Sequence, residues 1–299
     1  MLQHIRRNSG DMHRNLVYDV LLFSIGPIGL LLNGLLLKLI ASKRSRPAID
    51  CILLTIIAEL DLLTSVYIIV SQVWKWLSGY SVVRDASAWC YLSSSLGRMA
   101  KLASLDVTAL LSLVRYVAIV RGANIVNRYW LAVAIMLIGV IAALFTVKSV
   151  FTIPTVAASG LYCFALHDFE NPVFIAFHAI LPLFAVPPLF IIPTCYALVI
   201  SHYRRILTQI TDTLPRHLVY QSRGLLVITI AYALVIIPEY LIIVLCVYFK
   251  VEVSPDVDSM ARILISSITI VNPLFALFLH EDTRKELFSH WSKTQVYPQ

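Results

Sequence analysis

The sequence has 299 residues, of which 59% are hydrophobic and 14% charged, and its mean hydropathy is +0.81. Soluble domains carry about 25% charged residues, so this chain cannot enclose its apolar residues in one aqueous core, and a bilayer must be part of its solvent. The net charge of +7 does not indicate a nucleic-acid partner, because basic residues gather on one side of the predicted membrane. The sequence contains no Gly-rich phosphate loop, metal-spaced His/Cys cluster or nucleophile elbow, so we predict that it is not an enzyme.

Seven apolar runs are each long enough to cross about 30 Å of hydrocarbon, which takes roughly 20 residues. They cover residues 17–42, 50–75, 88–120, 127–153, 173–205, 217–249 and 258–279. After them, Leu287, Phe288 and Trp291 share one face of an amphipathic stretch at 281–291, which predicts a helix lying in the membrane plane. We therefore predict an all-α membrane protein, a seven-transmembrane helix bundle with a short cytoplasmic eighth helix. Its segments are an N-terminus (1–16), a seven-transmembrane domain (17–279) and the eighth helix with its tail (280–299).

Charges in the short loops set the predicted orientation. Lys43, Arg44 and Arg46 follow the first span, Arg121 follows the third, and further basic residues flank the loop after the fifth span and follow the seventh. These loops fall on one side, which the positive-inside rule makes cytoplasmic. Seven spans then place the N-terminus outside.

Polar or helix-breaking residues recur inside these spans, one or two in each. In chain order they are Asn33, Asp61, Arg115 with Tyr116, Trp130, Pro188 with Tyr196, Pro238, and Asn272 with Pro273. Such groups are costly in lipid and are usually retained for a purpose. Their repetition through seven helices favours a receptor over a generic bundle.

This ordered set resembles the rhodopsin-like (class A) G-protein-coupled receptors over residues 17–291. The matching elements are Asn33-Gly34, Ala58-Glu59-Leu60-Asp61, Arg115-Tyr116, the spacings of Cys90 to Arg115 and Pro188 to Tyr196, and Asn272-Pro273. The resemblance implies a plasma-membrane receptor that binds an unknown extracellular or lipid ligand within the bundle and activates a heterotrimeric G protein. The alternatives are a seven-helix transporter and a signalling-deficient, receptor-like scaffold.

The resemblance also implies roles for single residues in the inner half of the bundle. Asn33, Asp61, Ser104 and Asn272 would form a polar switch hub; either a sodium ion sits at Asp61 and Ser104, or a protonated Asp61 bonds to Asn33 and Asn272. G-protein coupling would use Arg115, Tyr116 and Tyr196, with hinges at Pro188, Pro238 and Pro273. Cys90 and Cys163 would form a disulfide that pins the second extracellular loop over the bundle.

Several positions depart from the family pattern. Val114 stands where an acidic residue usually precedes the arginine, and Leu218 stands at the other usual acidic partner. With both restraints on Arg115 missing, we expect raised basal activity. Ala276 replaces the tyrosine of the NPxxY motif, so a hydroxyl that would bridge to Tyr196 is missing.

Cationic residues mark the outer half of the third span, where Arg98 and Lys101 lie on one helix face. By resemblance, the ligand-binding residues are Arg98, Lys101, Glu239, Tyr240, Arg262 and Ser266. Either these cations bind an acidic ligand, such as a carboxylate or a phosphate-bearing lipid, or Lys101 pairs internally with Glu239 while Arg98 points outward. Gly97 stands where amine receptors carry an aspartate, which argues against an amine ligand. Ser266 stands where opsins carry the lysine that binds retinal, which argues against covalent retinal. Lys148 is predicted to extend to the membrane interface.

Overall fold

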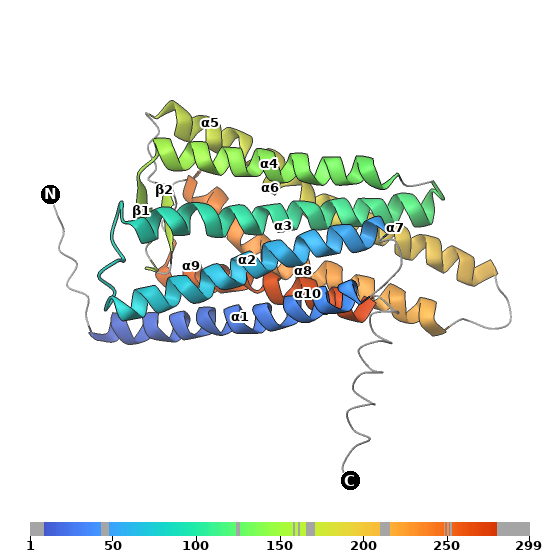
Figure 1. The fold of residues 1–299 in the computed structure, drawn as a ribbon, viewed down its shortest axis with the longest axis horizontal. Coiled ribbons are helices and arrows are strands. Elements are labelled where there is room, and N and C mark those ends of the chain that lie inside the picture. The colour runs from blue at the N-terminus through green and yellow to red at the C-terminus, as the bar shows by residue number, and fades with distance from the viewer. Residues whose placement is uncertain are drawn as a thin grey trace, which may run out of the picture.

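The computed structural model describes residues 9–42, 48–123, 126–157, 159–160, 162–165, 171–209, 216–247, 249, 251 and 253–279. The predicted eighth helix at 281–291 and most of the basic loop after the first span lie outside the described residues, as does the side chain of Leu218. The described part is a bundle of long helices with one small hairpin (Figure 1).

The helices follow the predicted spans. They are α1 (Ser9–Ala41), α2 (Ile49–Leu77), α3 (Ala88–Val120), α4 (Asn127–Phe151), α5 (Pro172–Ile180), α6 (Pro182–Ala185), α7 (Pro187–Gln209), α8 (Arg216–Val247), α9 (Pro255–Ser266) and α10 (Ile268–Leu279). Within the described residues, six segments are long and apolar enough to cross a membrane, with α5 to α7 and α9 to α10 each forming one span. The 32-residue α8 completes the seven-helix bundle.

Burial separates a central helix from a peripheral one. In the most apolar window of α3, 61% of the residues are buried, whereas the corresponding share in α4 is 17%. Figure 1 shows α3 in the middle of the bundle, with α4 on one side and α2 on the other. A helix that buries most of its surface against protein can carry polar side chains, so α3 is the helix on which the sites below are built.

Prolines interrupt the fifth span, which the sequence predicts as one helix. The interruptions fall at Leu181 and Val186, directly before Pro182 and Pro187, and Pro188 lies in the first turn of α7. Proline lacks the backbone donor that a continuous helix needs. The bends of this span therefore lie at and just before the predicted hinge position.

The seventh span also divides, at Ser267, which separates α9 from α10. Pro273 lies inside α10, and Pro238 lies inside α8 without breaking it. Whether these prolines act as hinges stays a prediction.

A two-stranded antiparallel hairpin lies between α4 and α5. Strand β1 (Pro154–Val156) pairs with β2 (Cys163–Ala165), and Val156 faces Cys163. Figure 1 shows the hairpin at the end of the bundle where α3 begins. The sequence does not predict these strands, which are too short to show a period of two residues.

Candidate functional site

The middle of the bundle contains a buried hydrogen-bonded cluster around Asp61. Ser104 Oγ donates to Asp61 Oδ1 at 2.8 Å, and Asn272 Nδ2 donates to Asp61 Oδ2 at 2.8 Å and contacts Ser104 Oγ at 3.1 Å. Tyr232 donates to Asn272 Oδ1. Asp61 and Ser104 are completely buried, so these bonds replace the water that each polar group would otherwise require. Four side chains from α2, α3, α8 and α10 are joined in this way.

Asn33 does not belong to this hydrogen-bonded cluster, so the prediction of a bond between Asn33 and Asp61 is wrong. Its Nδ2 donates at 2.8 Å to the carbonyl oxygens of Gly29 and Thr269. Pro273 is four residues after Thr269 and has no N–H with which to bond that carbonyl. Asn33 therefore supplies the donor that Pro273 lacks and joins α1 to α10.

The predicted sodium ion at Asp61 and Ser104 stays a prediction. Both carboxylate oxygens of Asp61 accept hydrogen bonds from neutral donors, Ser104 and Asn272. An ion at this position would have to displace or share these donors. The cluster is satisfied by protein groups as it stands.

At the C-terminal end of α3, Arg115 contacts a carboxylate that could not be recognised from the sequence alone. Its Nε lies 3.0 Å from Oδ2 of Asp50 in the first turn of α2, and its Nη1 donates at 3.5 Å to the hydroxyl of Tyr196. The two charged side chains are 14% and 29% exposed. The expectation that Arg115 lacks an acidic restraint is therefore wrong, and raised basal activity loses its premise.

The apolar surroundings of Val114 explain why this position carries no acidic residue. Val114 is completely buried in an apolar cluster with Leu53, Ile57 and Ala134. A carboxylate on that face would lose its water and find apolar neighbours. The acidic partner of Arg115 is instead carried by α2, and the available signal was an aspartate at the membrane boundary of the second span, level with the end of the third.

A cavity of about 30 Å³ lies between the Asp61 cluster and Arg115. Its lining includes Ala276, Tyr196, Tyr232, Asn272 and Arg115. The small side chain of Ala276, where the family's motif carries a tyrosine, lines this cavity. Tyr196 and Tyr232 are both buried in one apolar cluster, so two hydroxyl-bearing side chains from α7 and α8 flank the cavity.

Tyr116 has a different environment from Arg115, although the two are adjacent. It packs at the edge of the apolar cluster that contains Tyr196, Val199 and Tyr232. Of the three residues predicted to couple to a G protein, Arg115 and Tyr196 are in contact, and Tyr116 packs against the cluster that contains Tyr196. Coupling itself stays a prediction.

In the half of the bundle that carries the β1–β2 hairpin, called the outer half below, the predicted Lys101–Glu239 ion pair is wrong. Lys101 Nζ donates at 2.7 Å to Ser266 Oγ, and the cation near Glu239 is Arg262, with 3.9 Å between Nη1 and Oε1. Lys101 and Arg262 are 5% and 3% exposed. All six predicted ligand-binding residues lie on α3, α8 and α9, but Lys101 and Glu239 have other partners than each other.

Arg98 does not simply point outward. Its guanidinium lies 5.0 Å from the ring centroid of Tyr162, and the guanidinium of Arg262 lies 4.7 Å from the same ring. Tyr162 is in the loop between β1 and β2, and its hydroxyl donates to Asp258 of α9. Burial, with the carboxylates of Glu239 and Asp258 nearby, raises the pKa of Tyr162 well above its ordinary value. Tyr162 therefore stays a neutral donor, and its ring attracts both cations.

Tyr240 and Gly97, the two remaining positions in the outer half, both lie against apolar or aromatic side chains. Tyr240 packs against the apolar cluster that contains Leu102, Phe145 and Phe177. A side chain added at Gly97 would lie 2.4 Å from a ring atom of Tyr67. The place of the aspartate of amine receptors is therefore occupied by an aromatic ring from α2.

Lys148 is buried, which contradicts its predicted position at the interface. It is 3% exposed and donates at 3.3 Å to the carbonyl oxygen of Ser94 on α3. Its ammonium also lies 5.3 Å from the ring centroid of Phe177. Lys148 thus adds a further inward-facing cation to the outer half of the bundle.

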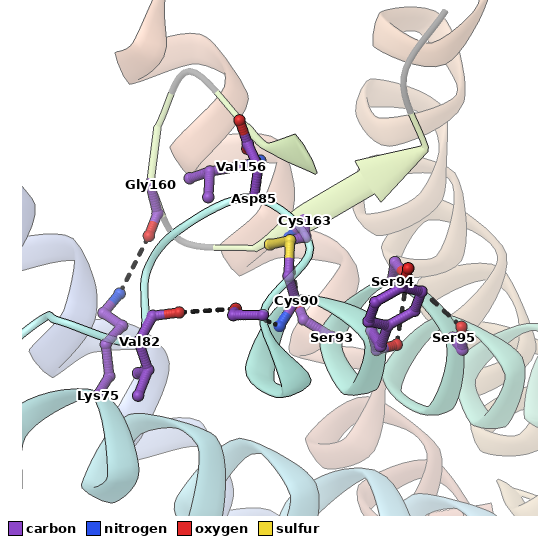
Figure 2. The surroundings of a disulfide bond; sticks show 12 residues. Lys75, Val82, Asp85, Cys90, Ser93, Ser94, Ser95, Val156, Gly160 and Cys163 are labelled. Carbon is purple, nitrogen blue, oxygen red and sulfur yellow. Dashed lines mark hydrogen bonds between the residues drawn. A yellow bond between two sulfur atoms is a disulfide. The ribbon is translucent and has the colours of Figure 1, made fainter. Parts of the chain in front are cut away.

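The predicted disulfide between Cys90 and Cys163 is present and joins β2 to the start of α3. Figure 2 shows two further attachments of this loop: Asp85 accepts from the Val156 amide at 2.7 Å, and Lys75 donates to the Gly160 carbonyl at 3.2 Å. The hairpin is therefore fixed to α2, to α3 and to the α2–α3 loop. The hairpin also lies over the basic residues Arg98 and Arg262, because its Tyr162 contacts both of them.

Lys75 also forms a buried ion pair with Asp19 of α1, at 2.6 Å, with side-chain exposures of 1% and 0%. Tyr80 donates to the second oxygen of Asp19 at 2.9 Å. Lys75 and Asp19 were not predicted to pair, although opposite charges near the outer ends of two consecutive spans were a signal.

The comparisons with known proteins define the class. The profile described as "7 transmembrane receptor (rhodopsin family)" matches residues 32–275, so the chain belongs to the rhodopsin family of seven-transmembrane receptors and is a receptor rather than an enzyme. Among solved structures it is similar to "Crystal structure of squid rhodopsin", with 14% identity, 94% of this chain and 87% of that chain covered, and a TM-score of 0.69. At this identity the similarity establishes the fold alone. None of the curated proteins matches the chain.

Proposed function

We propose that this multi-pass membrane protein resides in the plasma membrane with its N-terminus outside and activates a heterotrimeric G protein. Its ligand binds among the outer parts of α3, α8 and α9, beneath the β1–β2 hairpin. Such a ligand shifts an existing equilibrium between receptor states by binding one of them better.

The observation that carries this proposal is a chain of polar contacts running inward from mid-membrane. It begins with Asp61 and Asn272, continues through Tyr232 to the cavity, and reaches Tyr196 and Arg115 on its far side. A cavity flanked by hydroxyls and a guanidinium gives these groups room for a second arrangement. A rearrangement of α8 near Tyr232 would therefore change the surroundings of Arg115.

The outer site connects to this path through α8. Glu239 directly follows Pro238, and Tyr232 lies about two turns away on the same helix. Proline permits a bend because it removes a backbone hydrogen bond. A ligand that alters the contact between Arg262 and Glu239 thus acts on the helix that carries Tyr232.

Nucleotide exchange on a panel of Gα subunits, in membranes containing this chain, tests the proposal. Arg115→Ala is compared with Arg128→Ala, which removes an exposed arginine at the start of α4. Exchange that Arg115→Ala abolishes and Arg128→Ala retains supports a receptor. A chain that promotes no exchange under any condition, including with the Asp50 variant described below, supports the signalling-deficient scaffold.

A further inference from the structure

Buried charges in the outer half of the bundle are poorly matched. Lys101 contacts a neutral hydroxyl on Ser266, and no carboxylate of the described residues lies within 4.0 Å of its ammonium. Buried ammonium groups normally pair with an anion, because removing a charge from water without compensation is strongly unfavourable. A neutral hydroxyl provides little of that compensation.

The carboxylate nearest this site is a weak partner for its own cation. Glu239 and Arg262 are separated by 3.9 Å, longer than the 2.7–2.9 Å of a charge-assisted hydrogen bond. Within the described part of the chain, Glu239 Oε2 has no hydrogen-bond partner although it is buried. Arg98 Nε is likewise buried without a partner.

Positive charge also exceeds negative charge among these residues. Arg98 and Arg262 lie over the ring of Tyr162, and Lys101 bonds to Ser266, one helical turn after Arg262 on α9. The other carboxylate beside Tyr162 is Asp258, which accepts the tyrosine hydroxyl. Three cations therefore face one weakly engaged carboxylate in addition to that aspartate.

We propose that Lys101 and Arg262 together bind the anionic head of the activating ligand, a carboxylate or phosphate, and that Glu239 holds the place of that group in its absence. This inference rests on the proposed function and names its ligand class. When the ligand anion reaches Arg262, Glu239 is released. Because Glu239 follows Pro238, its release loosens the outer part of α8 from α9.

The proposal predicts opposite effects for two kinds of variant. Lys101→Gln and Arg262→Gln each remove a cation and weaken anion binding by about tenfold or more, the size expected when a charged hydrogen bond is lost. Glu239→Gln removes the competing anion and tightens binding. A gain in affinity is not produced by misfolding, so this variant keeps the test decisive even if a cation variant fails to fold.

Binding is measured on the purified full chain in nanodiscs of neutral phospholipid, so that no G protein is needed. The probes are oleate, butyrate and lysophosphatidate, with oleyl alcohol as the uncharged counterpart of oleate and Lys38→Gln, an exposed lysine on α1, as the matched control variant. Preference for oleate or lysophosphatidate identifies a lipid headgroup, and preference for butyrate identifies a small soluble acid.

The expected result is binding of at least one anionic probe that is stronger in Glu239→Gln and weaker in Lys101→Gln, with Lys38→Gln unchanged. Equal binding of oleate and oleyl alcohol would overturn the proposal. So would a lack of binding by all three anions to both the wild type and Glu239→Gln. Because G-protein exchange is measured separately, failure here leaves the receptor function standing.

Discussion

Replacing Asp50 by asparagine should raise G-protein activation without any ligand. Asp50 provides a carboxylate to Arg115, at 3.0 Å, in the arrangement described here. If Arg115 must leave this contact to engage a G protein, then removing the charge favours the engaged state. Asparagine keeps the size of the side chain, so the change isolates the charge.

The magnitude follows from the geometry and exposure of the pair. Fully exposed ion pairs contribute about 0.2–1 kcal/mol, and hydrogen bonds to charged groups contribute about 1.5–3 kcal/mol. With exposures of 14% and 29%, the Arg115–Asp50 contact falls between these classes, at about 1–2 kcal/mol after allowance for screening by solvent. A shift of that size changes a two-state ratio by about 5- to 30-fold.

The assay is basal nucleotide exchange by the responsive Gα subunit, at equal receptor density in the membrane. Glu59→Gln is the matched control, because it removes an exposed carboxylate from the same helix. Asp50→Glu, which keeps the charge, should stay near the wild-type rate. Equal basal rates for Asp50→Asn, Glu59→Gln and the wild type would refute the view that Asp50 restrains Arg115.

Three further predictions concern stability, measured as thermal unfolding of the purified chain. Cys90→Ser should lower stability by about 2–4 kcal/mol by removing the disulfide, while Cys51→Ser, a change to a free cysteine, should have a much smaller effect; similar losses for both would argue against the disulfide. Asn33→Ala should cost about 1–3 kcal/mol, because a buried carbonyl loses its donor, and an unchanged midpoint would contradict that role. Lys75→Met should cost about 3–5 kcal/mol of stability, because it leaves Asp19 buried without its cation. Adding Asp19→Asn to Lys75→Met should recover part of that loss. A double variant less stable than Lys75→Met alone would show that the pair is not coupled.

The number and position of the membrane spans could be predicted because they depend on composition and on the length of apolar runs. Lipid requires apolar runs of defined length, so the spans were visible without any partner. The disulfide was implied by the family resemblance and is present. The breaks at Leu181 and Val186 were harder to place, because several neighbouring prolines are equally able to end a helix, and the break at Ser267 has no proline beside it.

The partners of charged residues could not be predicted, because spacing gives the face of a helix but not what lies opposite. Lys101 was expected to meet Glu239 and instead meets Ser266, one turn beyond Arg262 on the same face of α9. Arg115 found Asp50 on a neighbouring helix. Long flexible side chains choose among several groups within reach, and small rotations of α3 or α9 decide the choice.

The roles of three further residues could not be predicted, for a different reason. Asp50, Lys75 and Tyr232 belong to none of the motifs that carry the resemblance, and their roles appear only through contacts with other helices. Tyr232 stands out because its hydroxyl reaches Asn272 from α8 and flanks the cavity beside Ala276. The cavity beside Ala276 of α10, which has no hydroxyl, is thus lined by the hydroxyl-bearing Tyr232 of α8.

The most direct test of the central claim, that Arg115 couples this receptor to a G protein and Asp50 restrains it, is basal nucleotide exchange by the double variant Asp50→Asn/Arg115→Ala. The account predicts that Asp50→Asn raises exchange and that adding Arg115→Ala returns it to the level of membranes without receptor. Exchange that remains raised in the double variant would contradict the claim, because the activation would then not pass through Arg115.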